Sequence, residues 1–260
     1  MTDAIYTTKL IKATALLADT KTLLASWDLT RDVAANLDEA RRSNIFGKAS
    51  RKRVEDILNI FRQRYFEDEE VGQALVALTQ GNAPGQWLDP LLYYYSVKND
   101  ATLRDVVLQV VAPRSMKGYT DLTPEHVTRV VRDWIAEGKT TTAWGEETIE
   151  RVVRHSIATL RDFGILKGKV NKSITPLYLP VESFVFLAFE VWRNLRSGEK
   201  VLHNPIWDLF FLPTQGVERF FLEAHQERLL SYHAAGSVIR LEFPANSLVE
   251  VANVLVERAR

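Results

Sequence analysis

Between Trp144 and Pro180, the spacing of hydrophobic residues changes from a helical pattern to a strand-like one. Apolar or small residues recur at helical spacing from Ile149 to Phe163, which places them on one side of an α-helix. They are Ile149, Val152, Val153, Ser156, Ile157, Leu160 and Phe163. Gly164 follows, and glycine tolerates the positive φ at which helices commonly end. The pattern therefore predicts an amphipathic helix that ends at Gly164.

The outward side of this helix and the segment after it are rich in basic residues. Ile165–Val170 and Ile174–Leu179 are typical of two strands joined by a polar turn at Asn171–Ser173. The basic side chains of the helix and hairpin are Arg151, Arg154, His155, Arg161, Lys167, Lys169 and Lys172. A basic helix followed by a basic hairpin is typical of a winged helix-turn-helix, whose helix enters the major groove of DNA.

A protein-binding role fits the same pattern, because winged modules that bind only protein also consist of a helix and a hairpin. Several carboxylates also dilute the basic face of the helix. They are Glu146, Glu147, Glu150 and Asp162. The pattern alone therefore leaves nucleic-acid binding and protein binding open.

The chain before this stretch predicts helices only. We expect them at residues 7–27, 29–42, from Ser50 through Tyr65, 71–79, 87–96 and 102–111. Ser50 and Asp100 are suitable helix N-caps. A segment containing proline and glycine, Pro113–Asp121, then marks a domain boundary.

The chain after this boundary mixes helices with short hairpins. Thr123 as N-cap and Pro124 in the first turn predict a helix that ends at Gly138. Beyond the central stretch we expect helices at 182–195, 205–211 and 214–227, a hairpin at 229–243, and a last helix capped by Ser247. The predicted fold is mainly α, with an N-terminal helical bundle followed by a winged helix-turn-helix-like domain with short β-hairpins. The expected domains are an all-helical domain at 1–115, a winged module at 116–180, and a helical part with a hairpin at 181–260, packed on the winged helix.

A second basic cluster lies around the start of the helix at Ser50. Its members are Arg41, Arg42, Lys48, Arg51, Lys52 and Arg53. Cations are unfavourable in the first turn of a helix, where the macrodipole is already positive, so this placement predicts an anion site for a nucleic-acid phosphate. The alternative is a solvated cluster paired with the acidic run Glu67–Glu70.

Composition limits the class of protein. Lys plus Arg equals Asp plus Glu, at 33 each, which argues against a protein that coats nucleic acid over its whole surface but permits one basic face balanced by an acidic one. The absence of cysteine excludes disulfides, zinc–thiolate sites and cysteine nucleophiles. The most apolar run, Phe184–Trp192, is too short to span a bilayer, and the N-terminus lacks a signal-peptide core. We expect a cytoplasmic protein without membrane contact.

The search for catalytic motifs gives a negative result. The glycines between Gly81 and Gly85 lack the spacing and the Lys-Ser/Thr ending of a phosphate-binding loop. The five histidines are dispersed, and no nucleophile elbow or zinc-binding histidine pair is present. The sequence therefore predicts no active site, no metal and no cofactor.

Several short motifs, taken in order, resemble the BrxA family of the bacteriophage-exclusion (BREX) systems of bacteria. They are Thr8-Lys9-Leu10, Lys48-Ala49-Ser50 with Arg51-Lys52-Arg53-Val54, Leu91-Leu92-Tyr93, Leu103-Arg104-Asp105, Ala112-Pro113-Arg114, Leu229-Leu230-Ser231-Tyr232 and Ile239-Arg240-Leu241-Glu242-Phe243. The resemblance covers nearly the whole chain. It implies a helical part similar to the antitermination protein NusB, winged-helix character elsewhere, and binding of double-stranded DNA. It also implies other BREX subunits as partners, including BrxB, the ATPase BrxC, the methyltransferase PglX, the phosphatase-like PglZ and the Lon-like BrxL.

These expectations combine into one hypothesis with two alternatives. We expect a non-enzymatic, double-stranded-DNA-binding BREX component that contacts mainly the phosphate backbone through the two basic clusters. The first alternative is a protein-interaction adaptor of the defence complex that does not itself bind DNA. The second is an RNA-binding protein of the NusB kind.

Overall fold

The structure, a computed structural model, describes residues 6–236 and 238–259. It divides into two units whose segments alternate along the chain. Unit 1 contains the described residues up to Leu17, Tyr93–Leu177 and Leu209–Phe211. Unit 2 contains Ala18–Leu92, Tyr178–Asp208 and the described residues from Leu212 onward. This division cuts the chain at different places from the three consecutive domains expected from the sequence.

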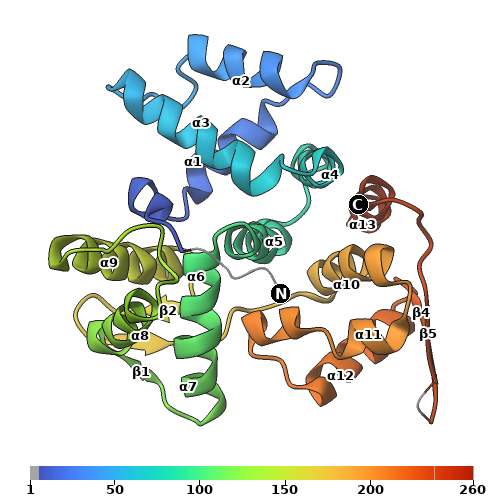
Figure 1. Cartoon of the computed structure of the whole chain (residues 1–260). Helices are drawn as coiled ribbons and strands as arrows, with labels where there is room; N and C mark the ends of the chain where they lie inside the picture. The colour runs from blue at the N-terminus through green and yellow to red at the C-terminus, as the bar shows by residue number, and fades with distance from the viewer. Residues whose placement is uncertain (1–5, 237, 260) are drawn as a thin grey trace. The chain divides into compact units, whose positions relative to one another are not determined.

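The structure confirms a mainly helical protein with small antiparallel sheets (Figure 1). Unit 1 contains η1 (Lys9–Lys12), α6 (Ala101–Val106), η2 (Val107–Val111), α7 (Ala112–Met116), α8 (Pro124–Ala136) and α9 (Glu146–Asp162). Its sheet is formed by β1 (Asp121–Leu122), β2 (Leu166–Lys167) and β3 (Lys172–Ile174). Strand β3 lies in the middle and pairs antiparallel with both neighbours.

Unit 2 contains most of the remaining helices. They are α2 (Val33–Arg42), α3 (Arg51–Tyr65), α4 (Glu69–Gln80), α10 (Val181–Leu195), α11 (Gly198–Leu202), α12 (Thr214–Gln226) and α13 (Leu248–Arg258). A hairpin of β4 (Ser231–Ala235) and β5 (Val238–Glu242) completes it. The unit boundaries fall inside or at the end of α1 (Leu17–Ala25), α5 (Gly85–Lys98) and η3 (Pro205–Phe210).

The core of unit 2 joins distant parts of the sequence. Helix α13 packs against α4, and α10 packs against α11, α12 and α13. The ring of Phe184 stacks on Trp207 and Phe220, at centroid distances of 4.8 Å in both cases. Trp207 and Phe221 are buried as part of this core.

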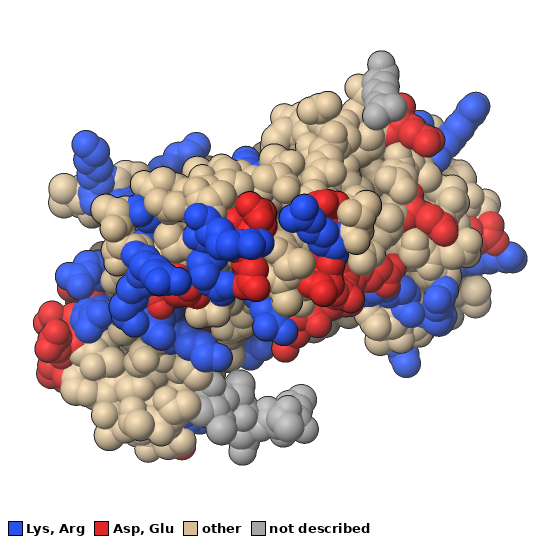
Figure 2. All heavy atoms as spheres, turned by 90° about the horizontal axis from the view of Figure 1, so that it is seen from above, with Lys and Arg blue, Asp and Glu red and all other residues tan. Residues whose placement is uncertain are grey.

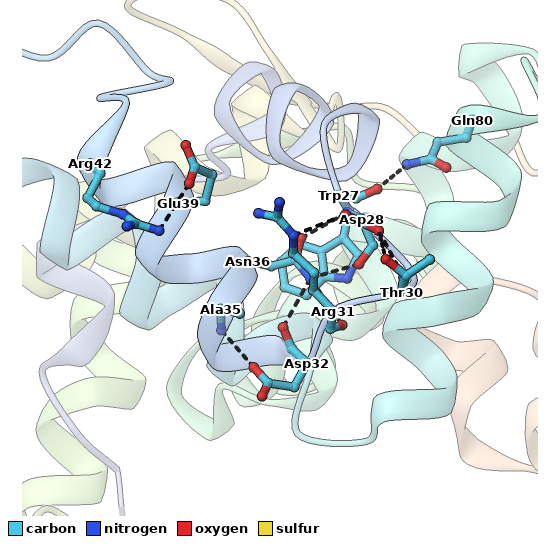
Figure 3. A network of polar contacts seen from close by, with 10 residues as sticks. All are labelled: Trp27, Asp28, Thr30, Arg31, Asp32, Ala35, Asn36, Glu39, Arg42 and Gln80. Carbon is cyan, nitrogen blue, oxygen red and sulfur yellow. Dashed lines mark hydrogen bonds and ion pairs between the residues drawn. The ribbon is translucent and has the colours of Figure 1, made fainter.

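A buried asparagine organises the loop between α1 and α2 (Figure 3). The side chain of Asn36 donates to the carbonyls of Asp28 at 2.9 Å and Asp32 at 3.0 Å. Its carbonyl oxygen accepts the backbone N–H of Asp28 at 2.8 Å. Asp32 caps α2 by accepting from Ala35 N. These bonds satisfy backbone groups that the loop would otherwise leave without partners.

Three details of the predicted elements are wrong. The expected single helix at 7–27 is broken, because Ala13 is extended and Leu16 has a φ of +54°. The helix expected at 102–111 is longer, since α6, η2 and α7 form one continuous helical run that continues through Pro113 to Met116. The hairpin turns at Gly168–Asn171 rather than at Asn171–Ser173. Gly168 has a φ of +97°, and a Cβ there would lie 2.1 Å from the Asn171 oxygen, so the turn requires glycine.

Candidate nucleic-acid interface

Helix α9 has the two faces that the sequence predicted. Residues 149, 152, 153, 156, 157, 160 and 163, which form the predicted apolar stripe, are all buried. On the opposite face Arg151 and Arg154 are exposed, and neither makes a hydrogen bond or ion pair with the described part of the chain. Their guanidinium groups are therefore available to an external anion.

The hairpin after α9 adds further cations. Lys167 and Lys169 are exposed, and their ammonium groups have no ion pair within the described residues. Lys172 instead closes the hairpin turn, because its Nζ donates to the Gly168 carbonyl at 2.9 Å and also to that of Lys169. Arg161 forms an ion pair with Asp162 at 3.2 Å. Lys172 and Arg161 therefore already have partners within the unit formed by α9 and its hairpin.

His155 does not add charge to this face. Burial, followed by the charges of Arg154 and Arg151, lowers the pKa of its imidazole below the usual value. The ring is therefore neutral near neutral pH. Its Nδ1 is buried and has no hydrogen-bond partner among the described residues. His155 can contribute shape or a neutral hydrogen bond, but no Coulombic attraction.

A groove of about 680 Å³ runs beside this face, between the start of α8, one side of α9 and the hairpin. Its apolar lining includes Ile149, Val153, Ile157, Ala158 and Val170. Its charged lining consists of Arg132, Arg154, Arg161, Lys169 and Lys172 together with Glu125, Glu146 and Glu150. Arg132 is paired with Glu146 at 2.8 Å. The groove therefore combines an apolar wall with charges of both signs, which suits a protein surface as well as a phosphate backbone.

The second predicted cluster lies at the corner between α2 and α3 in unit 2. It surrounds a hollow of about 390 Å³. Three of its six cations form these ion pairs: Arg41 with Glu55 at 2.6 Å and with Asp38, Arg42 with Glu39 at 3.0 Å, and Lys48 with Asp19 at 2.9 Å. The hydrogen bonds of Glu55 and Asp38 raise the pKa of Arg41. These pairs neutralise half of the cluster.

The remaining cations of this corner are in the first turn of α3. Arg51 and Lys52 are exposed and have no hydrogen bond or ion pair among the described residues, whereas Arg53 is half-buried. Ser50 occupies the N-cap position, but its side chain accepts no capping hydrogen bond. In the acidic run Glu67–Glu70, which the sequence suggested as a partner of this cluster, Asp68 and Glu70 instead bind Arg193.

The charges on the face drawn in Figure 2 are interspersed. Lysine and arginine side chains lie among aspartate and glutamate side chains there and do not form an uninterrupted basic surface. The two predicted clusters belong to different units, so each is a separate candidate site.

The sequence interpretation missed a third cationic hollow, of about 240 Å³, between α7 and α8 in unit 1. Its lining includes Arg114, Lys117, Tyr119, His126 and Arg129. A sequence signal existed, since histidine occupies the third position of α8, where a capping box usually has glutamate or glutamine. The basic residues come from two helices separated by a strand, so their convergence was not visible in the linear pattern.

None of these sites resembles a metal centre. Within residues 6–236 and 238–259, no group of three or more His, Cys, Asp or Glu side chains is placed to hold a metal ion. Every helix in the same residues is too short or too polar to cross a membrane.

Comparison with known protein families places the chain in one of them. The family model described as BrxA matches residues 4–191 of the chain. No curated protein shows significant sequence similarity to it.

Proposed function

The chain belongs to the BrxA family, and on that premise we propose that it is a non-enzymatic component of a BREX system that binds double-stranded DNA. Family membership itself implies a role in BREX phage defence. DNA binding is the additional step, and the support for it comes from the module that contains α9.

The order of elements in unit 1 carries this proposal. Helix α7 is followed by β1, α8, α9, β2 and β3, with β3 in the middle of the sheet. We take this order as support for a winged helix-turn-helix module. In such a module the second helix of the pair enters the major groove and the hairpin lies along the backbone. Helix α9 and the β2–β3 hairpin would take these roles.

The available cations fit contacts with phosphates rather than with bases. Arg151 and Arg154 on α9, with Lys167 and Lys169 on the hairpin, are exposed and lack internal partners in the described chain. Lysine and arginine contacts to phosphate carry no sequence information directly. We therefore expect sequence-tolerant binding of duplex DNA, with additional backbone contacts at Arg51 and Lys52 of α3.

A second candidate function is favoured by the carboxylates of the groove beside α9. Glu125, Glu146 and Glu150 line it together with apolar side chains, and carboxylates there would repel a DNA backbone. A protein partner with complementary charge would fit such a surface. In this alternative the chain is an adaptor that binds another BREX subunit, such as BrxB, BrxC, PglX or PglZ, without itself holding DNA.

Charge reversal on α9 tests the proposal. We expect the double variant Arg151→Glu with Arg154→Glu to bind a random-sequence duplex at least about tenfold more weakly, because two phosphate contacts are lost. Each lost contact should also reduce the slope of log K against log salt by about 0.9. The measurement is fluorescence anisotropy of labelled duplexes across a salt series. Unlabelled structured RNA serves as competitor, since preferential displacement by RNA would favour the NusB-like alternative.

The matched control is Arg219→Glu on α12. Arg219 is also exposed, helical and without an ion pair in the described residues, but it lies in unit 2. If the double variant binds duplex as the control does, α9 is not the DNA contact. If the unmodified protein binds no duplex at low salt, the adaptor function replaces the proposed one.

A further inference from the structure

The cationic hollow between α7 and α8 has a composition different from that of the groove beside α9. It is lined by Arg114, Lys117, His126 and Arg129 together with Tyr119 and Gln109, and no carboxylate is among the described residues that line it; Asp121, which pairs with Arg114, lies outside this lining. We propose that this hollow, the α7–α8 pocket, binds the phosphate group of a nucleotide. The phosphate could belong to a free mononucleotide or to the backbone of duplex DNA.

A widened helical turn forms one wall of the pocket. Segment η2 is a π-helix, and its last turn closes through a hydrogen bond from Ala112 N to the Val107 carbonyl, five residues back. Pro113 follows and has no N–H, which disfavours the regular α-helical pattern at this position. Single π turns inside α-helices occur frequently at functional sites. Here the turn places Gln109, Val110 and Pro113 along the pocket.

Arg114 is held in a fixed orientation at the pocket. Its Nε donates to the Asp121 carbonyl at 3.0 Å, and its Nη2 donates to the Asp121 carboxylate at 2.9 Å. The guanidinium carbon lies 5.1 Å from the centre of the Tyr119 ring. These contacts leave Nη1 without a hydrogen bond or ion pair among the described residues. A pre-oriented guanidinium loses less freedom when it binds an anion.

The other basic groups of the pocket are not neutralised. Lys117 and Arg129 are exposed and have no ion pair in the described part of the chain. His126 accepts the Thr123 backbone N–H at its Nδ1, at 3.1 Å, so the proton of the neutral ring must be on Nε2. Each of these side chains can therefore donate to phosphate oxygens, and charge-assisted hydrogen bonds of this kind are the strong ones.

Tyr119 explains why we infer a nucleotide rather than an isolated inorganic ion. Its side chain is a large hydrophobic group that is 55% exposed at the rim of the pocket. Bases stack on exposed aromatic rings beside basic grooves irrespective of their identity. The duplex version of this inference rests on the proposed function, whereas the mononucleotide version does not.

The test removes the charges that have no internal role. The double variant Lys117→Gln with Arg129→Gln is compared with Arg219→Gln. Arg219 is an exposed arginine of α12 in unit 2, has no ion pair among the described residues, and lines neither the pocket nor the groove beside α9. Adenosine monophosphate and inorganic phosphate are titrated by calorimetry, and duplex DNA by anisotropy at low salt. Loss of two charge-assisted contacts should weaken the affected ligand about tenfold or more, while the control stays unchanged. The variant Lys117→Arg with Arg129→Lys keeps both charges and should restore most of the binding.

The choice of probes distinguishes a free nucleotide from the DNA backbone as the source of the phosphate. It also distinguishes failure of the pocket from failure of the proposed DNA-binding function. A loss for adenosine monophosphate identifies a free nucleotide, and a loss for duplex alone identifies the backbone. If the double variant binds every probe as Arg219→Gln does, or if the unmodified protein binds none of them, the pocket is not a phosphate site. Duplex binding that depends on α9 but not on the pocket would retain the proposed function and overturn this inference. Pocket-dependent nucleotide binding without any duplex binding would retain this inference and overturn the proposed function.

Discussion

The arginines and lysines of unit 2 and those of the α9 module differ in what surrounds them. At the α2–α3 corner Arg41, Arg42 and Lys48 are each paired with a carboxylate within 3.0 Å. On α9, Arg151 and Arg154 are exposed without such a partner in the described chain. Both clusters are equally basic in the sequence. Only the second keeps most of its charge available, so the density of cations along a chain does not measure its attraction for phosphate.

Arg193 is the extreme case in unit 2. Its guanidinium binds Asp68 and Glu70 of the α4 region and lies 2.8 Å from Glu190 of its own helix. Burial disfavours its charge, but the hydrogen bond with Asp68 and the charge of Glu190 raise its pKa above the usual value. Glu70 also accepts the Leu248 N–H at the start of α13. Arg193 therefore links α10 to the start of α4, and the Glu70 carboxylate that it binds also holds the first residue of α13. The role of this arginine is structural.

The largest expected effect is a loss of stability when Arg193 is replaced, because this arginine is structural whereas those of α9 are available for binding. Replacement by methionine leaves Glu190, which is 2% exposed, without the guanidinium that balances it. Removing one partner of a buried ion pair typically costs about 3–5 kcal/mol, so we expect a loss of that order in the free energy of unfolding. Urea unfolding followed by circular dichroism measures it. The control Arg219→Met removes an exposed arginine from α12, and an equal loss in both variants would refute a structural role for the Arg193 network.

A smaller effect is expected at the α2–α3 corner, in DNA binding rather than in stability. Arg51→Gln with Lys52→Gln removes two cations in the first turn of α3 that have no ion pair among the described residues. If both contact phosphate, the slope of log K against log salt should become shallower by up to about 1.8, at about 0.9 per contact. Arg41→Gln with Arg42→Gln removes the same charge from paired positions and should change the slope less. Equal changes would show that ion pairing does not decide which cations bind DNA.

The smallest expected effect is on how the stability of the protein depends on pH in the acidic range. Burial opposes ionisation of Asp68, but its hydrogen bond with Arg193 and the Arg193 charge lower the pKa of Asp68 below its usual value. A carboxyl whose folded-state pKa is depressed stabilises the protein above its unfolded-state pKa, about 3.9 for aspartate. That stabilisation is lost as the pH falls through the folded-state pKa. We therefore expect the unmodified protein to lose more stability below about pH 4 than Arg193→Met does. Parallel curves of urea midpoint against pH would contradict this assignment.

Much of the local structure could be predicted from the sequence because periodicity and capping are local. The buried stripe of α9 is the predicted one, and Asp100 and Ser247 cap α6 and α13 by accepting from Leu103 N and Glu250 N. The short β1 strand was missed because a two-residue strand has no alternation to detect. The turn of the hairpin was misplaced because Gly168, rather than the polar residues after it, adopts the positive φ.

The sequence by itself determined that this chain is a mainly helical BrxA-family protein, where most of its helices lie, and which residues carry positive charge. Tertiary structure alone decided which of those charges remain available. Arg41 meets Glu55 from the next helix, and Arg193 meets Asp68 and Glu70 from more than a hundred positions away. It also brought Arg114, Lys117 and Arg129 to one pocket, with no carboxylate among its described lining residues. The physical reason is that Coulombic pairing depends on distances of a few ångströms in space, which folding sets between residues far apart in the chain.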